Sequence, residues 1–361
     1  MLKITAGEFA KIVSGQLHEI SESTMIDQAP VINSKNATKD SFFVAFEGQQ
    51  VDGHNFVTEA INLGAKFALV SKPVSEPHIL VADTGKALID LAIYIRSKLP
   101  ELKIVGITGS QGKTTSKEFL HSILKLEGET VATAGNFNTD IGVPLTLLRC
   151  NEQTKFCILE MGARHSGDIA KLTKIAKPNV GVVLVVGTAH IGEFGSVEAI
   201  AKTKAELITN LPSNSTAVLG NYDIYTPKMA DSLELKKVLF GVNQNVRAAD
   251  LEMHGGYAHF DLVTPAGRNP VSLQVLGEHQ VPNALAAAAA AFALGVGNEN
   301  IAVGLTTATL DSKWRMQIEE INGIHLIHDY YNANPESMKA ALKTLILLIH
   351  SLFLVISFNS R

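Results

Sequence analysis

The stretch KIVGITGSQGKTT at residues 103–115 combines an apolar strand, a glycine-containing turn and the start of a helix. The strand is predicted over residues 103–108 and the helix over residues 115–128, with Gly128 as its stop. A phosphate-binding loop needs this order of elements. Backbone N–H groups of residues 109–113 can surround phosphate oxygens, because glycine permits a close approach and the helix N-terminus adds a partial positive charge.

Two side chains of this loop have specific predicted roles. Lys113 would reach the β- and γ-phosphates of a nucleotide, and the hydroxyl of Thr114 would hold Mg²⁺. The general pattern has a glycine where this chain has Ile107, so a turn that only joins strand to helix is the alternative interpretation. The predicted phosphate-binding residues are Gly109, Ser110, Gln111, Gly112, Lys113, Thr114 and Thr115.

Strands and helices alternate beyond this loop. Apolar strands are predicted at 155–162, 180–187, 216–220 and 237–241, and helices at 166–176, 196–211 and 281–295. Such runs of Val, Ile and Leu between helices indicate an α/β domain with a mainly parallel sheet covered on both faces. The segment 254–276 is predicted to be a hairpin appended to that sheet, with TPAGRN as its turn.

The first hundred residues have a different pattern of short strands. Strands are predicted at 42–48, 66–71 and 78–82, followed by a helix at 84–98. Pro100 marks a boundary, because the residue before a proline disfavours the helical conformation. A second domain is therefore predicted to begin at about Lys103.

Length and composition limit the class of protein. At about 150 residues per domain, 361 residues make two or three domains. The 31 Lys and Arg against 35 Asp and Glu leave a net charge of −4, which argues against a broad basic face for nucleic acid. The two cysteines are too few for a disulfide framework, and the N-terminus has no signal-peptide pattern. We therefore expect a cytoplasmic α/β enzyme.

Polar residues at strand ends are candidate metal ligands. Glu160 ends the apolar strand FCILE, where a carboxylate can meet Mg²⁺ at the carboxyl edge of a parallel sheet. His190 follows the next strand and is placed at the same edge, although a loop histidine is more often a surface residue. Lys202 and Lys204 read as solvated lysines of the following helix.

Several strings of the chain, in order, resemble the Mur ligase family of ATP-dependent, amide-forming enzymes of peptidoglycan synthesis. They are DGHNFVTEAINLGA (52–65), TGSQGKTT (108–115), GNFNTDIGVPLTLL (135–148), LEMGARHSGDI (159–169), AHIGEFGSVEAIAKTKAEL (189–207), GEHQVPNALAAAA (277–289), WRM (314–316) and HDYYNANPESMKAAL (328–342). The family's shortened phosphate loop accounts for Ile107. The resemblance implies a UDP-substrate-binding domain at 1–100, a central ATP-binding domain at 101–312 and the start of a third, Rossmann-like domain at 313–361.

The resemblance also implies site residues. Lys113, Glu160, His190 and Lys204 would be catalytic; Thr114, Glu160, His190 and Lys204 would hold two Mg²⁺ ions; Asn283, Arg315 and Asp329 would contact ATP; and Ser34, Lys35, Asp52, His54, Asn138 and Thr139 would face the UDP-linked substrate. Lys204 matches a lysine that is carbamylated in the family. The resemblance therefore implies a metal-binding role for Lys204, in place of its interpretation as a solvated lysine. The chain departs from the family's Asp-Ser-Arg motif at Asn33-Ser34-Lys35, which lacks arginine's bidentate fork, and it has Gln280 where asparagine is usual.

The implied reaction is ATP-dependent joining of D-alanyl-D-alanine to UDP-N-acetylmuramoyl-tripeptide (UDP-MurNAc-tripeptide) through an acyl phosphate, by a monomer that binds neither nucleic acid nor a membrane. The strings NANPESM and GVPLTLL favour this reaction over those of sibling ligases that add another amino acid. The resemblance ends at Leu342, and the acid-free apolar segment 343–361 is predicted to be a frameshift product, with a membrane-docking or partner-docking tail as the alternative. A nucleotide-binding remnant without ligase activity is the alternative function.

Overall fold

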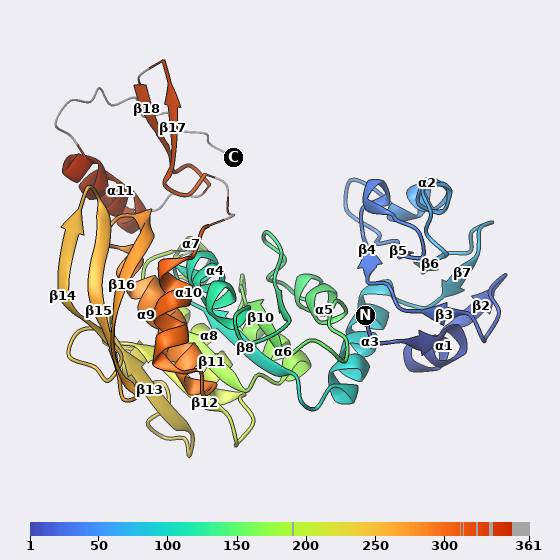
Figure 1. Cartoon of the computed structure of the whole chain (residues 1–361). Coiled ribbons are helices and arrows are strands. Elements are labelled where there is room, and N and C mark those ends of the chain that lie inside the picture. Colours follow the sequence, from blue (N-terminus) through green and yellow to red (C-terminus); the bar gives the residue numbers. More distant parts are fainter. Residues whose placement is uncertain (190, 311, 313, 323, 332–334, 349–361) are drawn as a thin grey trace. The chain divides into compact units, whose positions relative to one another are not determined.

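The computed structural model describes the chain from Met1 to Leu348, apart from residues 190, 311, 313, 323 and 332–334, and leaves residues 349–361 undescribed (Figure 1). The chain divides into two compact units. One consists of residues 1–103, 131–159 and 174–176, and the other of residues 104–130, 160–173 and 177–361. The three-domain division expected from the sequence stays a prediction.

The N-terminal region is built on a five-stranded mixed sheet. Its strand order is β2-β7-β6-β5-β4, with β4 to β7 parallel and β2 antiparallel to β7. The strands are β2 (Gln16–His18), β4 (Pro30–Val31), β5 (Phe42–Val44), β6 (Phe67–Val70) and β7 (His78–Leu80), with β1 (Ile4–Thr5) and β3 (Met25–Ile26) forming a separate pair. The helices are α1 (Ala6–Val13), α2 (Val57–Asn62) and α3 (Thr84–Lys98), with short 3-10 turns η1 (Ser34–Asn36) and η2 (Gly53–Phe56).

Three phenylalanines fill the core beneath this sheet. Phe42 and Phe67 stack with ring centroids 5.3 Å apart, and Phe9 of α1 meets Phe42 edge-on at the same distance. All three side chains are buried, so they anchor α1 against β5 and β6. The three predicted strands are confirmed in shorter form, and the helix predicted over 84–98 is confirmed with the same bounds.

The central region is built on a six-stranded parallel sheet. Its strand order is β13-β12-β11-β8-β10-β9. The strands are β8 (Lys103–Thr108), β9 (Thr130–Ala132), β10 (Phe156–Glu160), β11 (Val180–Val183), β12 (Thr216–Gly220) and β13 (Lys236–Phe240). This confirms the mainly parallel sheet expected from the sequence. Buried Val, Ile and Leu side chains along β8, β10, β11 and β12 account for the continuous apolar runs.

Helices surround this sheet. They are α4 (Lys113–Leu124), α5 (Gly142–Leu147), α6 (Asp168–Ala176), α7 (Ile191–Phe194), α8 (Val197–Thr209), α9 (Gln280–Ala293) and α10 (Asn298–Thr306), with the 3-10 turn η3 (Thr226–Lys228). Right-handed crossovers place α4 on one face and α6 and α8 on the other, and α9 and α10 pack against α4 (Figure 1). The alanines at 286–291 are all buried, so they are packing residues of α9.

The prediction of a hairpin appended to the parallel sheet was wrong in two respects. Residues 247–276 form a separate three-stranded antiparallel sheet from β14 (Arg247–His254), β15 (Tyr257–Thr264) and β16 (Gly267–Leu276). The turn is also shorter than TPAGRN, because Thr264 already pairs with Gly267. The first strand, RAADLEMH, was missed although residues 249–254 alternate between apolar and polar side chains.

The last described elements are short. Strands β17 (Gln317–Ile321) and β18 (Ile324–His328) form an antiparallel pair, and α11 spans Pro335–Leu348. Helix α11 therefore continues past Leu342 into the apolar segment, whose residues 349–361 lie outside the described part. Among the described residues, no helix is both long and apolar enough to cross a membrane.

Candidate functional site

The predicted phosphate loop lies between β8 and the first residue of α4. Gly112 has φ of +81°, a left-handed conformation that favours glycine. A Cβ atom on Gly112 would lie 2.1 Å from Oδ1 of Asn283, so a larger residue would collide with that side chain. The structure thus brings Asn283, a predicted ATP contact on α9, against the loop itself.

Ser110 fixes the loop from inside. Its backbone N–H donates to the carbonyl of Val185 at 2.9 Å, and its buried hydroxyl accepts a hydrogen bond from the Gly187 N–H at 2.9 Å. Both partners belong to the segment that follows β11. Ser110 therefore ties the loop to the neighbouring strand of the sheet.

Thr114 and Glu160 meet at the carboxyl edge of the sheet, as the sequence predicted. The Thr114 hydroxyl donates to Oε2 of Glu160 at 3.0 Å, and Glu160 is buried at the end of β10. Hydroxyl and carboxylate oxygens are ligands that Mg²⁺ accepts, so this pair fits the predicted metal. His190 lies outside the described residues, within which no cluster of three or more His, Cys, Asp or Glu side chains could hold a metal ion.

Arg315 approaches the same hydroxyl from the segment before β17. Its Nη2 donates to Thr114 Oγ1 at 3.2 Å, and its guanidinium carbon lies 4.3 Å from the centre of the Tyr331 ring. Its buried Nε has no hydrogen-bond partner in the described part of the chain. A buried, unsatisfied guanidinium N–H next to a phosphate loop is a donor suited to an anion.

Two lysines add positive charge to this site. Burial lowers the pKa of Lys113, and nearby Arg315 acts in the same direction, whereas Glu160 opposes the shift. The Lys113 ammonium donates to the Gly109 carbonyl at 2.9 Å. Burial, together with the charge of Lys113, lowers the pKa of Lys204 on α8 to about 7. Lys113 and Arg315 thus lie near one carboxylate, and Lys204 lies near Lys113, which suits a polyanionic ligand.

Two further predicted ATP contacts lie at the edges of this group. Burial raises the pKa of Asp329, whose carboxylate accepts a hydrogen bond from the Met316 N–H at 3.3 Å. Asn283 donates to Oε1 of the buried Gln280 at 2.9 Å, so the two amides orient each other at the start of α9. The glutamine in place of asparagine therefore keeps an amide partner for Asn283.

The predicted substrate residues Ser34 and Lys35 lie in the N-terminal region. The Ser34 hydroxyl donates to the Glu59 carboxylate, and Ser34 is buried. Lys35 is exposed, and its N–H donates to the Asn33 side chain at 3.1 Å, which caps the turn η1. Of Ser34 and Lys35, Lys35 is the residue that is exposed to solvent.

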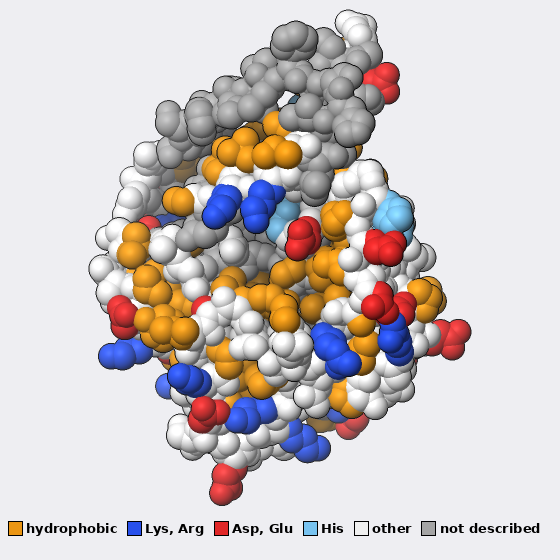
Figure 2. All heavy atoms as spheres, turned by 90° about the vertical axis from the view of Figure 1, so that its left-hand side faces the viewer, with side chains coloured by type: hydrophobic (Ala, Val, Ile, Leu, Met, Phe, Trp, Pro, Cys, Tyr) orange, Lys and Arg blue, Asp and Glu red, His pale blue; other side chains and the backbone are white. Residues whose placement is uncertain are grey.

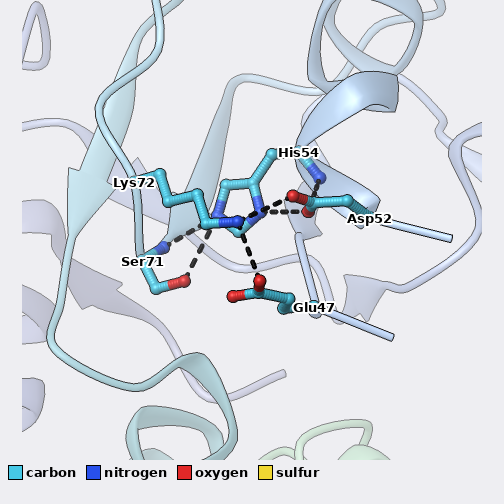
Figure 3. Close-up of polar contacts among 5 residues, drawn as sticks. All are labelled: Glu47, Asp52, His54, Ser71 and Lys72. Carbon is cyan, nitrogen blue, oxygen red and sulfur yellow. Dashed lines mark hydrogen bonds and ion pairs between the residues drawn. The ribbon is translucent and has the colours of Figure 1, made fainter. Parts of the chain in front are cut away.

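Asp52 and His54 form a polar cluster with residues that the sequence analysis did not select (Figure 3). Asp52 lies 2.6 Å from Nδ1 of His54 and 2.8 Å from Nζ of Lys72, and Lys72 also lies 3.0 Å from Glu47. Hydrogen bonds from Lys72 and His54 hold the pKa of the Asp52 carboxyl far below its usual range.

A signal for Lys72 was present in the sequence. Lys72 follows the carboxyl end of β6, and Glu47 follows that of its parallel neighbour β5. Carboxyl ends of parallel strands meet at one edge, which is the rule that identified Glu160. It could have been applied to the N-terminal sheet as well.

Asn138 and Thr139 lie between β9 and α5. They belong to the first compact unit, whereas the phosphate loop belongs to the second. Thr139 is exposed, and its carbonyl accepts the Val143 N–H at 2.9 Å, which begins α5.

A cavity of about 670 Å³ lies between the start of α9, the strand β14 and α11. On the face shown in Figure 2, hydrophobic side chains gather in a hollow with Lys and Arg side chains near it. The lining includes Tyr222, Arg247, Glu278, His279, Lys339 and Lys343. None of the predicted ATP-binding residues lines this cavity.

Comparisons with known proteins agree on one family. Residues 107–291 match the Mur ligase middle domain, and residues 31–97 match the Mur ligase family catalytic domain. A relative from Mycobacterium bovis, UDP-N-acetylmuramoyl-tripeptide–D-alanyl-D-alanine ligase, is 36% identical over 97% of this chain and 75% of its own length.

Solved structures show the same likeness in three dimensions. MurF from Acinetobacter baumannii has a TM-score of 0.87 and 36% identity over 96% of this chain and 77% of its own. MurF ligase from Thermotoga maritima in complex with ADP has a TM-score of 0.75 and 31% identity over 89% of this chain and 75% of its own. This chain thus spans about three quarters of each relative.

Proposed function

This chain belongs to the Mur ligase family, and we propose that it joins D-alanyl-D-alanine to UDP-MurNAc-tripeptide at the expense of ATP, in peptidoglycan precursor synthesis. The observation that carries the proposal is the phosphate loop, where Lys113 and Arg315 lie beside the Thr114–Glu160 pair and Lys204 lies near Lys113. The similarity to ligases of this name and to an ADP-bound MurF supports both the nucleotide and the substrates.

The chemistry proceeds in two steps. The terminal carboxylate of the tripeptide attacks the γ-phosphorus of ATP, so that ADP leaves and an acyl phosphate forms. The amine of D-alanyl-D-alanine then attacks the acyl carbon, phosphate leaves from the tetrahedral intermediate, and the nitrogen loses a proton. Lys113 and Arg315 would offset the negative charge that gathers when a carboxylate approaches ATP.

Thr114 and Glu160 would hold one Mg²⁺ ion, with His190 and Lys204 completing the proposed ligands for two ions. A bound Mg²⁺ would neutralise phosphate charge and orient the oxygens of ATP. The buried hydroxyl–carboxylate pair is the part of this arrangement that the described residues support.

Lys204 is proposed to carry a carbamate. Its pKa of about 7 leaves on the order of half of the amine unprotonated at neutral pH. The neutral Nζ attacks the carbon of CO₂, an N–C bond forms, and one proton is released, so a cation becomes a carboxylate. With ¹³C-labelled bicarbonate, we expect a carbamate signal in the carbon NMR spectrum that disappears in Lys204→Arg. An unchanged spectrum in that variant would contradict the assignment.

The reaction is proposed to take place in the cytoplasm, by a monomer. ATP is consumed, and Cys150 and Cys157 are both buried as free thiols, which suits a reducing compartment. Residues 1–100 are proposed to bind the UDP moiety, residues 101–312 to bind ATP, and residues from 313 onward to begin the third domain.

The decisive experiment is an ADP-release assay with the purified chain of 361 residues. We expect ADP only when both UDP-MurNAc-tripeptide and D-alanyl-D-alanine are present, together with the pentapeptide product by mass spectrometry. Other dipeptides and single amino acids serve as acceptor controls. ATP binding without any substrate-dependent ADP would contradict the ligase proposal, and product with another acceptor would assign the chain to a sibling reaction.

A further inference from the structure

We propose that Lys72 is a positioning residue that holds the loop of residues 47–52 closed, so that the tip of this loop can receive the uridine-nucleotide substrate. This inference rests on the proposed function, because it takes the N-terminal region as the site for that substrate. It assigns a role to a residue outside the family strings in the sequence, and it changes the roles expected of Asp52 and His54.

The loop is a short hairpin closed at its base. Glu47 and Asp52 face each other in an antiparallel bridge. The Gly48 N–H donates to the Val51 carbonyl at 3.0 Å, and the Gly53 N–H donates to the Phe46 carbonyl at 2.8 Å. Two carboxylates that lie directly opposite each other repel, so this base needs a cation.

Lys72 supplies that cation from the neighbouring strand β6. Its Nζ lies 3.0 Å from Glu47 and 2.8 Å from Asp52, so one ammonium bridges both sides of the loop base (Figure 3). The side chains of Lys72 and Glu47 are 46% and 63% exposed. Solvent therefore screens the ion pairs, and the effect of losing them should be moderate.

His54 holds Asp52 from the other side. The Ser71 N–H donates to Nε2 of His54 at 3.0 Å, so the hydrogen-bond network assigns the ring proton to Nδ1, which donates to Asp52 at 2.6 Å. Both ring nitrogens are thus engaged within the protein, and the ring is 7% exposed. Consecutive residues Ser71 and Lys72 fix the histidine and the two carboxylates together.

Asp52 is also fully engaged. One carboxylate oxygen accepts hydrogen bonds from the backbone and ring of His54, and the other accepts from Lys72. Asp52 and His54 therefore shape the loop rather than contact a ligand. The tip residues Gln49, Gln50 and Val51 are exposed and lie outside this ion-pair network, so they are available to a substrate.

Charge explains why the lysine matters for an anionic ligand. With Lys72 present, Glu47 and Asp52 are partly neutralised, whereas without it two carboxylates stand beside the diphosphate of the substrate. Lys72→Met should therefore loosen the loop and weaken substrate binding, because the unneutralised carboxylates of Glu47 and Asp52 would repel each other and the diphosphate. Removing one of these charges should then restore both properties.

The test measures loop order and substrate binding separately, in the full chain. Hydrogen exchange at the Gly48 and Gly53 amides reports the loop without any ligand, and calorimetry with UDP-MurNAc-tripeptide reports binding. In Lys72→Met we expect both exchange rates and the dissociation constant to rise about two- to fivefold, the range of exposed ion pairs. Lys72→Arg and the double variant Lys72→Met/Glu47→Gln should return both towards wild type.

Lys66→Met is the matched control. Lys66 precedes the same strand at its other end. Its Nζ lies 3.2 Å from a carboxylate oxygen of Asp40, so it also forms an ion pair. We expect this variant to leave loop exchange and substrate binding unchanged. If both changed as in Lys72→Met, the effect of Lys72→Met would reflect a general loss of stability.

Each outcome decides the proposal. Wild-type loop exchange in Lys72→Met would overturn it. A double variant with a protected loop but weak binding would also overturn it, because Lys72 would then contact the substrate directly. Loop exchange that rises without any change in substrate affinity would show that the loop does not receive the substrate. If the wild-type chain binds no UDP-MurNAc-tripeptide, the proposed function fails while loop exchange still tests the role of Lys72.

Discussion

Lys113 and Lys125 stand at the two ends of helix α4 and provide a matched pair for testing the phosphate loop. Lys113 is partly buried beside Arg315 and Glu160, whereas Lys125 is exposed at the C-cap of the helix. Lys113→Ala should abolish ATP binding in calorimetry, because it removes the cation next to the phosphates. Lys125→Ala should bind ATP as the wild type does. Unchanged affinity in Lys113→Ala would contradict the site.

Asp52 makes stability depend on pH. Its pKa is lowered in the folded chain by Lys72 and His54, so its contribution is fully present above the ordinary carboxyl pKa of about 4 and is lost as the pH falls towards the lowered value. Asp52→Asn should therefore melt below the wild type at pH 7, and the two melting temperatures should draw together as the pH falls below about 4 towards the lowered pKa. A constant difference across this range, measured by thermal denaturation, would contradict the assignment.

The helices over the central sheet pack closely because small residues face one another. The buried alanines 286–291 line α9, and Gly304 of α10 meets the backbone of α4. A Cβ atom on Gly304 would lie 2.5 Å from Cα of Ile123, which no side-chain rotation can relieve. The spacing between α4 and α10 therefore depends on this glycine.

Two alanine substitutions in α10 test this spacing. Gly304→Ala should lower the free energy of unfolding by about 1–2 kcal/mol, because overpacking outweighs the gain in helix propensity. Val303→Ala, at an exposed position next to it, should change the stability by less than about 0.5 kcal/mol. Urea denaturation measures both. Equal stabilities of the two variants would contradict close packing at Gly304.

At the scale of the whole chain, the two proposed ligands should protect different segments. ATP with Mg²⁺ should slow hydrogen exchange in residues 104–124 and in the start of α9, where the phosphate loop and Asn283 lie. UDP-MurNAc-tripeptide should slow exchange in the loop of residues 47–52 and around Lys35. Protection of residues 1–100 by ATP alone would contradict the proposed division of labour between the domains.

Much of the fold could be predicted because local patterns agreed with it. The strand 103–108 and the helix 84–98 were found with their bounds, since the former is continuously apolar and the latter is periodic, capped by Asp83 and followed by Pro100. The strand β14 was missed, although residues 249–254 alternate between apolar and polar side chains. Its pairing with β15 contains a bulge that only the folded sheet reveals.

The candidate site shows the same limit at the level of residues. Thr114 and Glu160 were predicted to meet, because each has a recognisable place at the end or start of an element. Tyr331 against Arg315 was not predicted, because an aromatic side chain at that position carries no local signal of its partner. Lys72 against Asp52 was also missed, although the strand-end rule could have been applied to the N-terminal sheet.

The sequence by itself determined the class of fold, the phosphate loop and the family, because apolar periodicity and the Gly-Lys-Thr string are local properties of the chain. Only the tertiary structure decided which groups are already satisfied and which are left for a ligand. Asp52 and His54 lie in a family motif, yet both ring nitrogens of His54 and both carboxylate oxygens of Asp52 are engaged with Ser71, Lys72 or each other. Hydrogen bonds between residues about twenty positions apart depend on strand order, and strand order is a property of the folded sheet.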